Sequence, residues 1–264
     1  MARPLRIGAL ISGGGSNLQA IIEACAAKQI DGHVVFVGSD NPEAQGLERA
    51  RGHGIATFVV DYKAIFKEAK GQSLDALLPE DFDLKEVLAM QSLMPAAADR
   101  EKMARYFGIR AVAEAALLNE MAHHPFDLLV LAGFMRVLTP YFIDRVNTDP
   151  SLPRIMNIHP AILPSFPGTD GYGDTYRYGC KVGGCTVHFV DYGEDTGAII
   201  GQKAFEIAPG DTMETVRKKG LKLEWELYPV CIQLFAKRHL KVLAKSHRAQ
   251  NGTVTRRKVV EIVP

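Results

Sequence analysis

Residues 5–28 read LRIGALISGGGSNLQAIIEACAAK, and this stretch decides the predicted fold. Residues 5–11 are an apolar run of strand length, and residues 18–28 have the apolar spacing and strong helix formers of an amphipathic helix. Three glycines at positions 13–15 connect the two. A strand, a glycine turn and a helix in this order predict the start of an α/β domain.

The same alternation continues along the chain. Apolar runs of strand length occupy residues 33–40, 55–61, 126–135, 154–160, 185–191 and 198–207, and helical patterns occupy residues 44–54 and 211–240. The run at 198–207 is expected at the sheet edge. We therefore predict a mostly parallel, Rossmann-like α/β sheet flanked by helices.

Two regions do not follow this alternation. Residues 67–108 contain helical pieces punctuated by proline, and they are expected to form a helical insertion. Residues 241–264 are polar and then basic, with only VVEIV indicating a late strand. We therefore expect a catalytic domain at 1–240, interrupted by the insertion, and a C-terminal tail at 241–264.

Composition excludes several classes of protein. The chain has 264 residues, 47% of them hydrophobic, and its 31 basic and 30 acidic side chains give no support for a nucleic-acid partner. No apolar stretch approaches the ~20 residues that a membrane span needs. Four cysteines form neither a C-x-x-C pair nor a zinc pattern. We expect a cytoplasmic protein with small-molecule substrates and no metal, as a monomer or a homodimer.

The glycine turn predicts a phosphate site. Backbone N–H groups and the positive end of the following helix can approach an anion there, and Ser16 and Asn17 are good helix-capping residues. Leu18 occupies the place of the third glycine of a dinucleotide fingerprint, and the Walker Gly-Lys-Ser/Thr pattern is absent. A phosphate monoester therefore fits better than NAD or ATP, and a tight turn without a ligand is the alternative.

A second group of polar residues follows the later strands. Residues 156–168 read MNIHPAILPSFPG, and Asn157 and His159 should point to the same side of a strand. The amide can stabilise an oxyanion and the imidazole can move a proton. Asp191, Glu194 and Asp195 follow the next strand and could orient the imidazole. This set suits acyl transfer without a covalent intermediate, although Asn157 and His159 could also be structural.

Five segments, in order, closely resemble the phosphoribosylglycinamide formyltransferase family of purine biosynthesis. They are LISGGGSNLQAII, VLAGFMRVL, MNIHPAILPSFPG, TVHFVDYGEDTGAII and ELYP, and the resemblance covers most of residues 5–66 and 109–240. It implies the formyltransferase fold and transfer of a formyl group from 10-formyltetrahydrofolate, as co-substrate, to the amine of glycinamide ribonucleotide. It also implies direct attack through a tetrahedral intermediate, without metal or NAD.

The resemblance also implies roles for individual residues. The catalytic residues would be Asn157, His159 and Asp195, with protonated His159 and Asn157 stabilising the oxyanion and Asp195 raising the pKa of His159. The residues implied for glycinamide ribonucleotide are Gly15, Ser16, Asn17 and Glu224. Those implied for the folate are Arg110, Met135, Arg136, Val137 and Leu138, together with Asn157.

The chain departs from the family in three places. Residues 169–184 are rich in Gly and Tyr where relatives carry a His-containing, helix-like segment, so another acceptor is conceivable. Leu221 occupies the place of a phosphate-side Lys or Gln, with Lys219 and Lys222 as candidate substitutes. The insertion at 67–108 could be a surface addition that covers apolar surface or builds a dimer contact, or a lid over the folate cleft.

Rival functions follow from the same residues. The chain could hydrolyse 10-formyltetrahydrofolate or formylate another amine, such as an amino sugar nucleotide. Formylation of methionyl-tRNA is disfavoured, because residues 241–264 are too few for a nucleic-acid-binding barrel. The rival outside enzymes is a regulator that binds folate or nucleotide, against which the intact Asn157, His159 and Asp195 argue.

Overall fold

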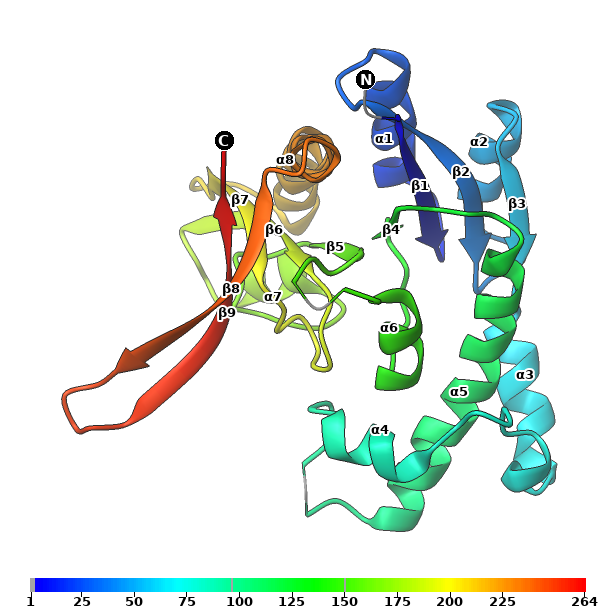
Figure 1. Cartoon of the computed structure of the whole chain (residues 1–264). Coiled ribbons are helices and arrows are strands. Elements are labelled where there is room, and N and C mark those ends of the chain that lie inside the picture. The colour runs from blue at the N-terminus through cyan, green and yellow to red at the C-terminus, as the bar shows by residue number, and fades with distance from the viewer. Residues whose placement is uncertain (1–2, 96, 150) are drawn as a thin grey trace.

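Seven strands form one sheet in the order β3-β2-β1-β4-β5-β6-β7 (Figure 1). The computed structural model describes residues 3–95, 97–149 and 151–264. The strands of the sheet are β1 (Leu5–Ile11), β2 (Gly32–Ser39), β3 (Ala56–Val59), β4 (Leu128–Leu131), β5 (Ile155–His159), β6 (Val182–Phe189) and β7 (Ile199–Glu206).

The sheet is mostly parallel, as predicted. Strands β1 to β5 pair in parallel, whereas β5 with β6 and β6 with β7 pair antiparallel. β7 lies at the edge, which confirms that prediction. Parallel strands end at the same side of a sheet, so the turns that follow β1, β4 and β5 meet at one place.

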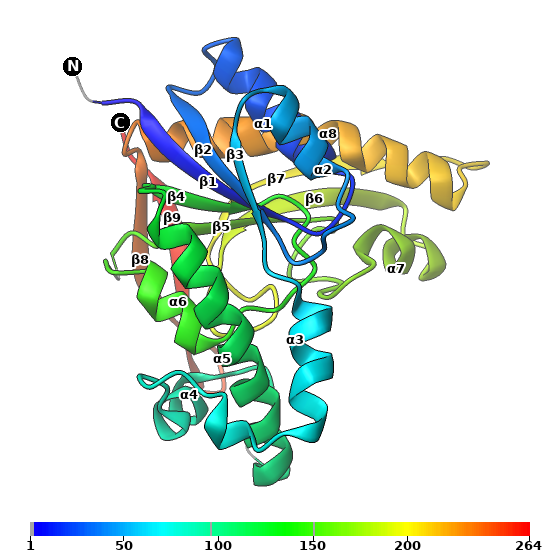
Figure 2. The same ribbon diagram turned by 90° about the vertical axis from the view of Figure 1, so that its right-hand side faces the viewer.

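Helices cover both faces of the sheet (Figure 2). One face packs against α1 (Ser16–Ala26), α2 (Gly46–Gly52) and α8 (Met213–Ala236), and the other packs against α3 (Tyr62–Glu68), α5 (Arg100–Ala122) and α6 (Pro140–Val146). All four residues of β4 are buried, because this central strand has a helix layer on each side.

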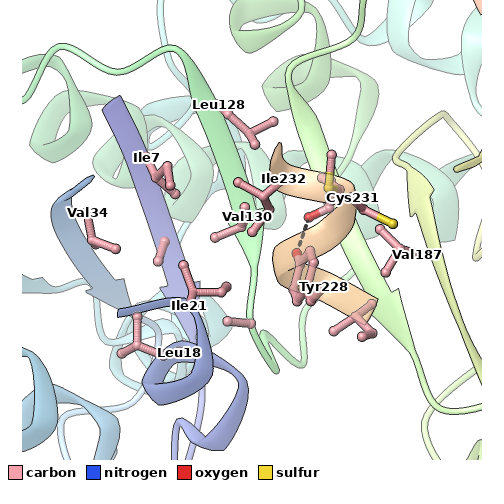
Figure 3. Close-up of a cluster of buried hydrophobic side chains, with 14 of the residues drawn as sticks. Ile7, Leu18, Ile21, Val34, Leu128, Val130, Val187, Tyr228, Cys231 and Ile232 are labelled. Carbon is pink, nitrogen blue, oxygen red and sulfur yellow. Dashed lines mark hydrogen bonds between the residues drawn. The ribbon is translucent and has the colours of Figure 1, made fainter. Parts of the chain in front are cut away.

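Helix α8 closes the core over β4, β5 and β6 (Figure 3). Tyr228, Cys231 and Ile232 are buried against side chains that include Val130 and Val187. The Tyr228 hydroxyl donates a hydrogen bond of 2.7 Å to the backbone carbonyl of Met156 in β5. This bond fixes the helix against the strand that carries the predicted catalytic residues, and it satisfies a hydroxyl that would be costly to bury alone.

The insertion is helical, as predicted. It contains the end of α3, two 3-10 helices at Ala69–Gly71 and Leu74–Ala76, α4 (Leu84–Met90) and the first turns of α5. A small cluster that includes Val87, Met103, Phe107 and Tyr141 joins α4 to α5 and α6. The insertion therefore has its own apolar contacts with the domain.

The segment predicted as a tail forms a β-hairpin instead. β8 (Leu240–Arg248) pairs antiparallel with β9 (Val254–Ile262) and projects from the body of the domain (Figure 1). Leu240 is buried in the main core, and Val242 and Val260 pack against it, so the base of the hairpin is anchored. The first four residues of VVEIV, 259–262, end β9, so the late strand that the sequence indicated is present. None of the helices in the described ranges is long and apolar enough to span a membrane.

Candidate active site

A cavity of about 400 Å³ lies where the turns after β1, β4 and β5 meet. Of the residues to which the family resemblance assigns a role, all but Arg110 line it. Its wall includes Gly15, Ser16, Asn17, Met135, Arg136, Val137, Leu138, Asn157, His159, Asp170, Tyr172, His188, Asp195, Arg217, Leu221 and Glu224.

The glycine turn forms one end of the cavity. Gly15 has a φ of 69°, a conformation that residues with a side chain rarely adopt, and a Cβ there would lie 2.8 Å from the Cα of Gly46. Both the backbone conformation and the close contact therefore require glycine at this position. Gly15 is also the N-cap of α1, and within the described part of the chain this end of the helix has no side-chain cap. The expectation that Ser16 and Asn17 cap the helix is therefore wrong, because both belong to its first turn. Their backbone N–H groups stay available for an anion.

A hydrogen bond connects Asn17, just after the glycine turn, to Glu224 of α8. Asn17 donates from Nδ2 to the Glu224 carboxylate at 2.6 Å, and the Tyr172 hydroxyl donates to the other carboxylate oxygen at 2.6 Å. Glu224 is only 4% exposed, and this burial raises its pKa, although both hydrogen bonds act to lower it. The Oδ1 atom of Asn17 is buried without a protein partner among the described residues. The pair thus presents a buried acceptor at the cavity wall.

The predicted catalytic residues come together at the other end. Nδ1 of His159 lies 3.2 Å from Oδ2 of Asp195, and the Gly168 N–H donates to the same oxygen at 2.9 Å. Asn157 and His159 leave β5 on the cavity side, as the period of two predicted. Nε2 of His159 is 2.7 Å from the Phe166 carbonyl. An amide, an imidazole and a carboxylate therefore share one wall of the cavity.

The protonation of His159 differs from the expectation. Burial lowers the pKa of His159 below its ordinary value, although the Asp195 carboxylate and the Phe166 carbonyl both act to raise it. The Asp195 carboxylate thus raises the pKa of His159, as expected, but desolvation outweighs this contribution. Burial acts to raise the pKa of Asp195, but its contacts with His188, His159 and Gly168 outweigh burial and lower it. Asp195 is thus an anion beside a largely neutral imidazole near pH 7.

His188 also belongs to this group, although it is not among the site residues predicted from the sequence. It lies directly opposite Asn157 across β5 and β6. Its Nδ1 is 2.9 Å from the Phe189 carbonyl, and its Nε2 is 3.2 Å from Asn157 Nδ2. Nε2 is also 3.5 Å from Oδ1 of Asp195. A histidine inside the otherwise apolar run of residues 185–191 is the feature of the sequence that could have indicated a role in the site.

The segment after β4 forms the predicted folate side. Met135, 56% exposed, and Arg136 lie at the cavity, and the Arg136 guanidinium pairs with the buried Asp40 at 2.5 Å. Arg110 does not reach the cavity wall. Its guanidinium lies 3.4 Å from the centre of the Tyr106 ring, one helical turn earlier on α5. Its contact with the folate stays a prediction.

The atypical segment 169–184 keeps a helix, α7 (Gly171–Arg177). It carries Tyr172 to Glu224, as described above. Leu221 lines the cavity without a charge, and neither Lys219 nor Lys222 is among the wall residues described. Lys219 pairs instead with Asp211 at 2.5 Å. The cation that α8 does bring to the wall is Arg217, one turn before Leu221.

Comparison with known proteins agrees with this geometry. The Formyl transferase family model matches residues 5–232. Phosphoribosylglycinamide formyltransferase from Bacillus subtilis is 32% identical over 222 residues, covering 84% of this chain and 90% of the relative. The Escherichia coli enzyme of the same name is 34% identical over 238 residues, with 90% of each chain covered.

A solved structure gives the same result. The glycinamide ribonucleotide transformylase 1 of Symbiobacterium toebii superposes with a TM-score of 0.72 at 32% identity, over 100% of this chain and 96% of that one. Sequence, fold and cavity thus agree along almost the whole chain, and the protein belongs to the phosphoribosylglycinamide formyltransferase family.

Proposed function

We propose that this protein transfers a formyl group from 10-formyltetrahydrofolate to the amine of glycinamide ribonucleotide, a step of de novo purine biosynthesis. The observation that carries the proposal is one cavity with two chemically different ends. Asn157, His159 and Asp195 lie at one end, and an uncapped helix start lies at the other. This arrangement suits an acceptor that has a phosphate at one end and a reacting amine at the other.

The proposed reaction is a direct transfer. The acceptor amine attacks the formyl carbon, and Asn157 donates a hydrogen bond to the oxygen that becomes negative. Neutral His159 would carry its proton on Nδ1, beside Asp195. Its Nε2 would exchange the Phe166 carbonyl for the amine, take the proton that the amine releases and leave an imidazolium beside Asp195. The bond from carbon to the folate nitrogen then breaks, and that nitrogen receives the proton, directly or through a water held by Asp195.

The acceptor would lie between the glycine turn and Glu224. N–H groups of Ser16 and Asn17 face its phosphate, and Glu224 accepts hydrogen bonds from its ribose hydroxyls. Arg217 would supply the positive charge that Leu221 lacks. Positions 217, 221 and 224 share one face of α8, and the long arginine side chain can span the extra turn of about 5.4 Å.

The state of Arg217 supports this assignment. It contacts Asp170 at 3.3 Å, but Asp170 already pairs with Arg177 at 2.9 Å, and the Arg217 side chain is 58% exposed. Such a weak surface pair costs little to exchange for a phosphate.

Other parts of the proposal concern the donor and the whole chain. Met135, Arg136, Val137 and Leu138 would contact the folate, with Asn157 between donor and acceptor. Residues 1–240 would form the catalytic domain, and the hairpin at 241–264 would be an appendage to it. A cytoplasmic location and the absence of a metal requirement are further parts of the proposal.

The test is a formyl-transfer assay with glycinamide ribonucleotide and a 10-formyl-folate. We expect formylated ribonucleotide to form, and folate release without acceptor to be much slower. Equal folate release in both reactions would indicate hydrolysis instead. Activity with an amino sugar nucleotide but not with glycinamide ribonucleotide would replace the acceptor, and binding without turnover would indicate a regulator.

A further inference from the structure

The helical insertion touches the loop that carries Asp195. The backbone N–H of Ser92, just after α4, donates a hydrogen bond of 3.0 Å to the carbonyl of Tyr192. The next residue, Gly193, packs so closely that a Cβ there would lie 2.9 Å from the Ser92 hydroxyl oxygen. Residues far apart in sequence therefore meet three residues before the proposed catalytic carboxylate.

The turn that makes this contact is itself fixed. The side chain of Gln91 accepts hydrogen bonds from the N–H groups of Leu93 and Met94, at 2.9 and 2.8 Å, and donates to the Met94 carbonyl at 3.1 Å. Before it, α4 is capped by Asp83 and buries Val87 in the cluster shared with α5 and α6. The insertion therefore presents the Ser92 N–H from a rigid base.

A second contact anchors the insertion to α6. Asp81 pairs with Arg145 at 2.6 Å and accepts a hydrogen bond from the Tyr141 hydroxyl at 3.0 Å. The same helix binds the catalytic loop, since Asp144 accepts from the Tyr192 hydroxyl at 2.5 Å. Tyr192 is thus held at its carbonyl by the insertion and at its hydroxyl by α6.

The loop requires support because Asp195 has a φ of 54°. This left-handed conformation costs a residue with a side chain on the order of 1–2 kcal/mol, and it persists only where the surroundings impose it. Inside the loop, Asp191 accepts from the Gly193 N–H and the Thr196 hydroxyl, at 3.2 and 2.6 Å. The contacts with Ser92 and Asp144 add the fixed points outside it.

The insertion does not act as a lid on the cavity in this structure. Its described residues, 67–95 and 97–108, are absent from the cavity wall, whereas Gly193, Glu194 and Asp195 belong to the wall. The described part of the insertion therefore contacts the loop without lining the cavity.

We propose that the insertion positions the Asp195 loop for catalysis, through the hydrogen bond from the Ser92 N–H to the Tyr192 carbonyl. This role rests on the proposed formyl transfer, because Asp195 acts there on His159. Ser92 is a positioning residue: it touches neither substrate, and it acts by fixing the distance from Asp195 to the imidazole. A displacement of about 1 Å at such a pair can cost on the order of 100-fold in rate.

The test compares Ser92→Pro with Ser92→Ala. Proline removes the N–H and alanine keeps it. Gln91 has φ −64° and ψ 145°, a conformation that tolerates a following proline. We expect Ser92→Pro to lower kcat by about tenfold or more, with the KM for the acceptor within about twofold, and Ser92→Ala to stay within about twofold of wild type in both.

The matched control is Ser73→Pro, elsewhere in the insertion. Ser73 has a φ of −64° and precedes the second 3-10 helix, so proline fits its backbone. We expect wild-type kinetics from it. If Ser92→Pro does not fold, as judged by its melting transition, Gln91→Ala gives the same test by loosening the turn, with an expected fall in kcat of a few-fold.

Two readouts are independent of turnover. Displacement of Asp195 should lower the pKa of His159, followed by NMR of its imidazole, and should speed hydrogen exchange at the Gly168 N–H, which donates to Asp195. An inactive wild type would refute the proposed function, and these readouts would still test the positioning role. A folded Ser92→Pro protein with unchanged kcat, His159 pKa and Gly168 exchange would overturn it.

Discussion

Asp195 and His159 lie 3.2 Å apart, from carboxylate Oδ2 to imidazole Nδ1, although α7 and β6 separate them in sequence. The same carboxylate oxygen accepts from the Gly168 N–H, so its orientation is fixed by the backbone as well as by the imidazole. The carboxylate is therefore held where it can stabilise an imidazolium that forms during the reaction.

Asp195→Asn should lower kcat by roughly 100-fold or more while the KM values change by less than about threefold. The amide keeps an oxygen for Gly168 but loses the charge that stabilises the imidazolium. His159→Ala should have an effect at least as large. Steady-state kinetics with both substrates measure the changes in kcat and KM separately. Near-normal turnover in both variants would exclude the proposed roles.

The pH dependence of the reaction should follow His159. Its pKa is lowered by burial and would be lower still without the Asp195 charge. We therefore expect the limb of the kcat/KM profile that His159 governs to move to lower pH in Asp195→Asn. NMR titration of the imidazole provides an independent measurement, and a shift to higher pH would contradict the assigned pairing.

Arg217→Ala should raise the KM for glycinamide ribonucleotide by about tenfold and leave kcat within about twofold, because one charge-assisted contact to phosphate is worth roughly 1.5–3 kcal/mol. Arg177→Ala is the matched control, since Arg177 also pairs with Asp170 but is absent from the described cavity wall. An equal rise in KM in both variants would argue against a direct phosphate contact.

A gain of function would strengthen the same assignment. Leu221→Lys, introduced into the Arg217→Ala protein, places an ammonium one turn closer to Glu224 on the same face of α8. We expect it to recover at least part of the lost acceptor affinity. Leu221→Met, similar in length but uncharged, should recover none.

Glu114 gives a prediction about stability. It is 1% exposed and accepts from the N–H of Thr139 at 2.8 Å, and burial raises its pKa to about 7. As pH rises above about 4.5, the unfolded chain loses this proton first, so the folded state loses stability until about pH 7.

Glu114→Gln removes this titration and keeps a partner for Thr139. Relative to the variant, wild type should lose roughly 3 kcal/mol of unfolding free energy between about pH 4.5 and 7. Denaturant unfolding at several pH values measures the difference. A difference between the two proteins that does not change with pH would show that Glu114 keeps its ordinary pKa.

Local patterns were sufficient to predict most of the fold. The apolar run, glycine turn and helix at residues 5–28 predicted the strand and helix that the structure contains, and the alternation at Asn157 and His159 predicted their common side. Hydrophobic periodicity reports which face is buried wherever a segment packs on one sheet. The resemblance selected Asp195 from the acidic residues Asp191, Glu194 and Asp195, and it added Glu224, which spacing alone could not place.

The sequence by itself determined the α/β architecture, the glycine turn and the residue types of the site, because each depends on neighbours within a few positions. Tertiary structure decided the rest. It places His188 beside Asn157 and stacks Arg110 on the Tyr106 ring. It also places Arg217 at the cavity wall and forms the hydrogen bond between Ser92 and Tyr192. It also determined that the pKa of His159 is lowered. Burial of the imidazole depends on every segment that packs around it, and a local sequence pattern does not contain that information.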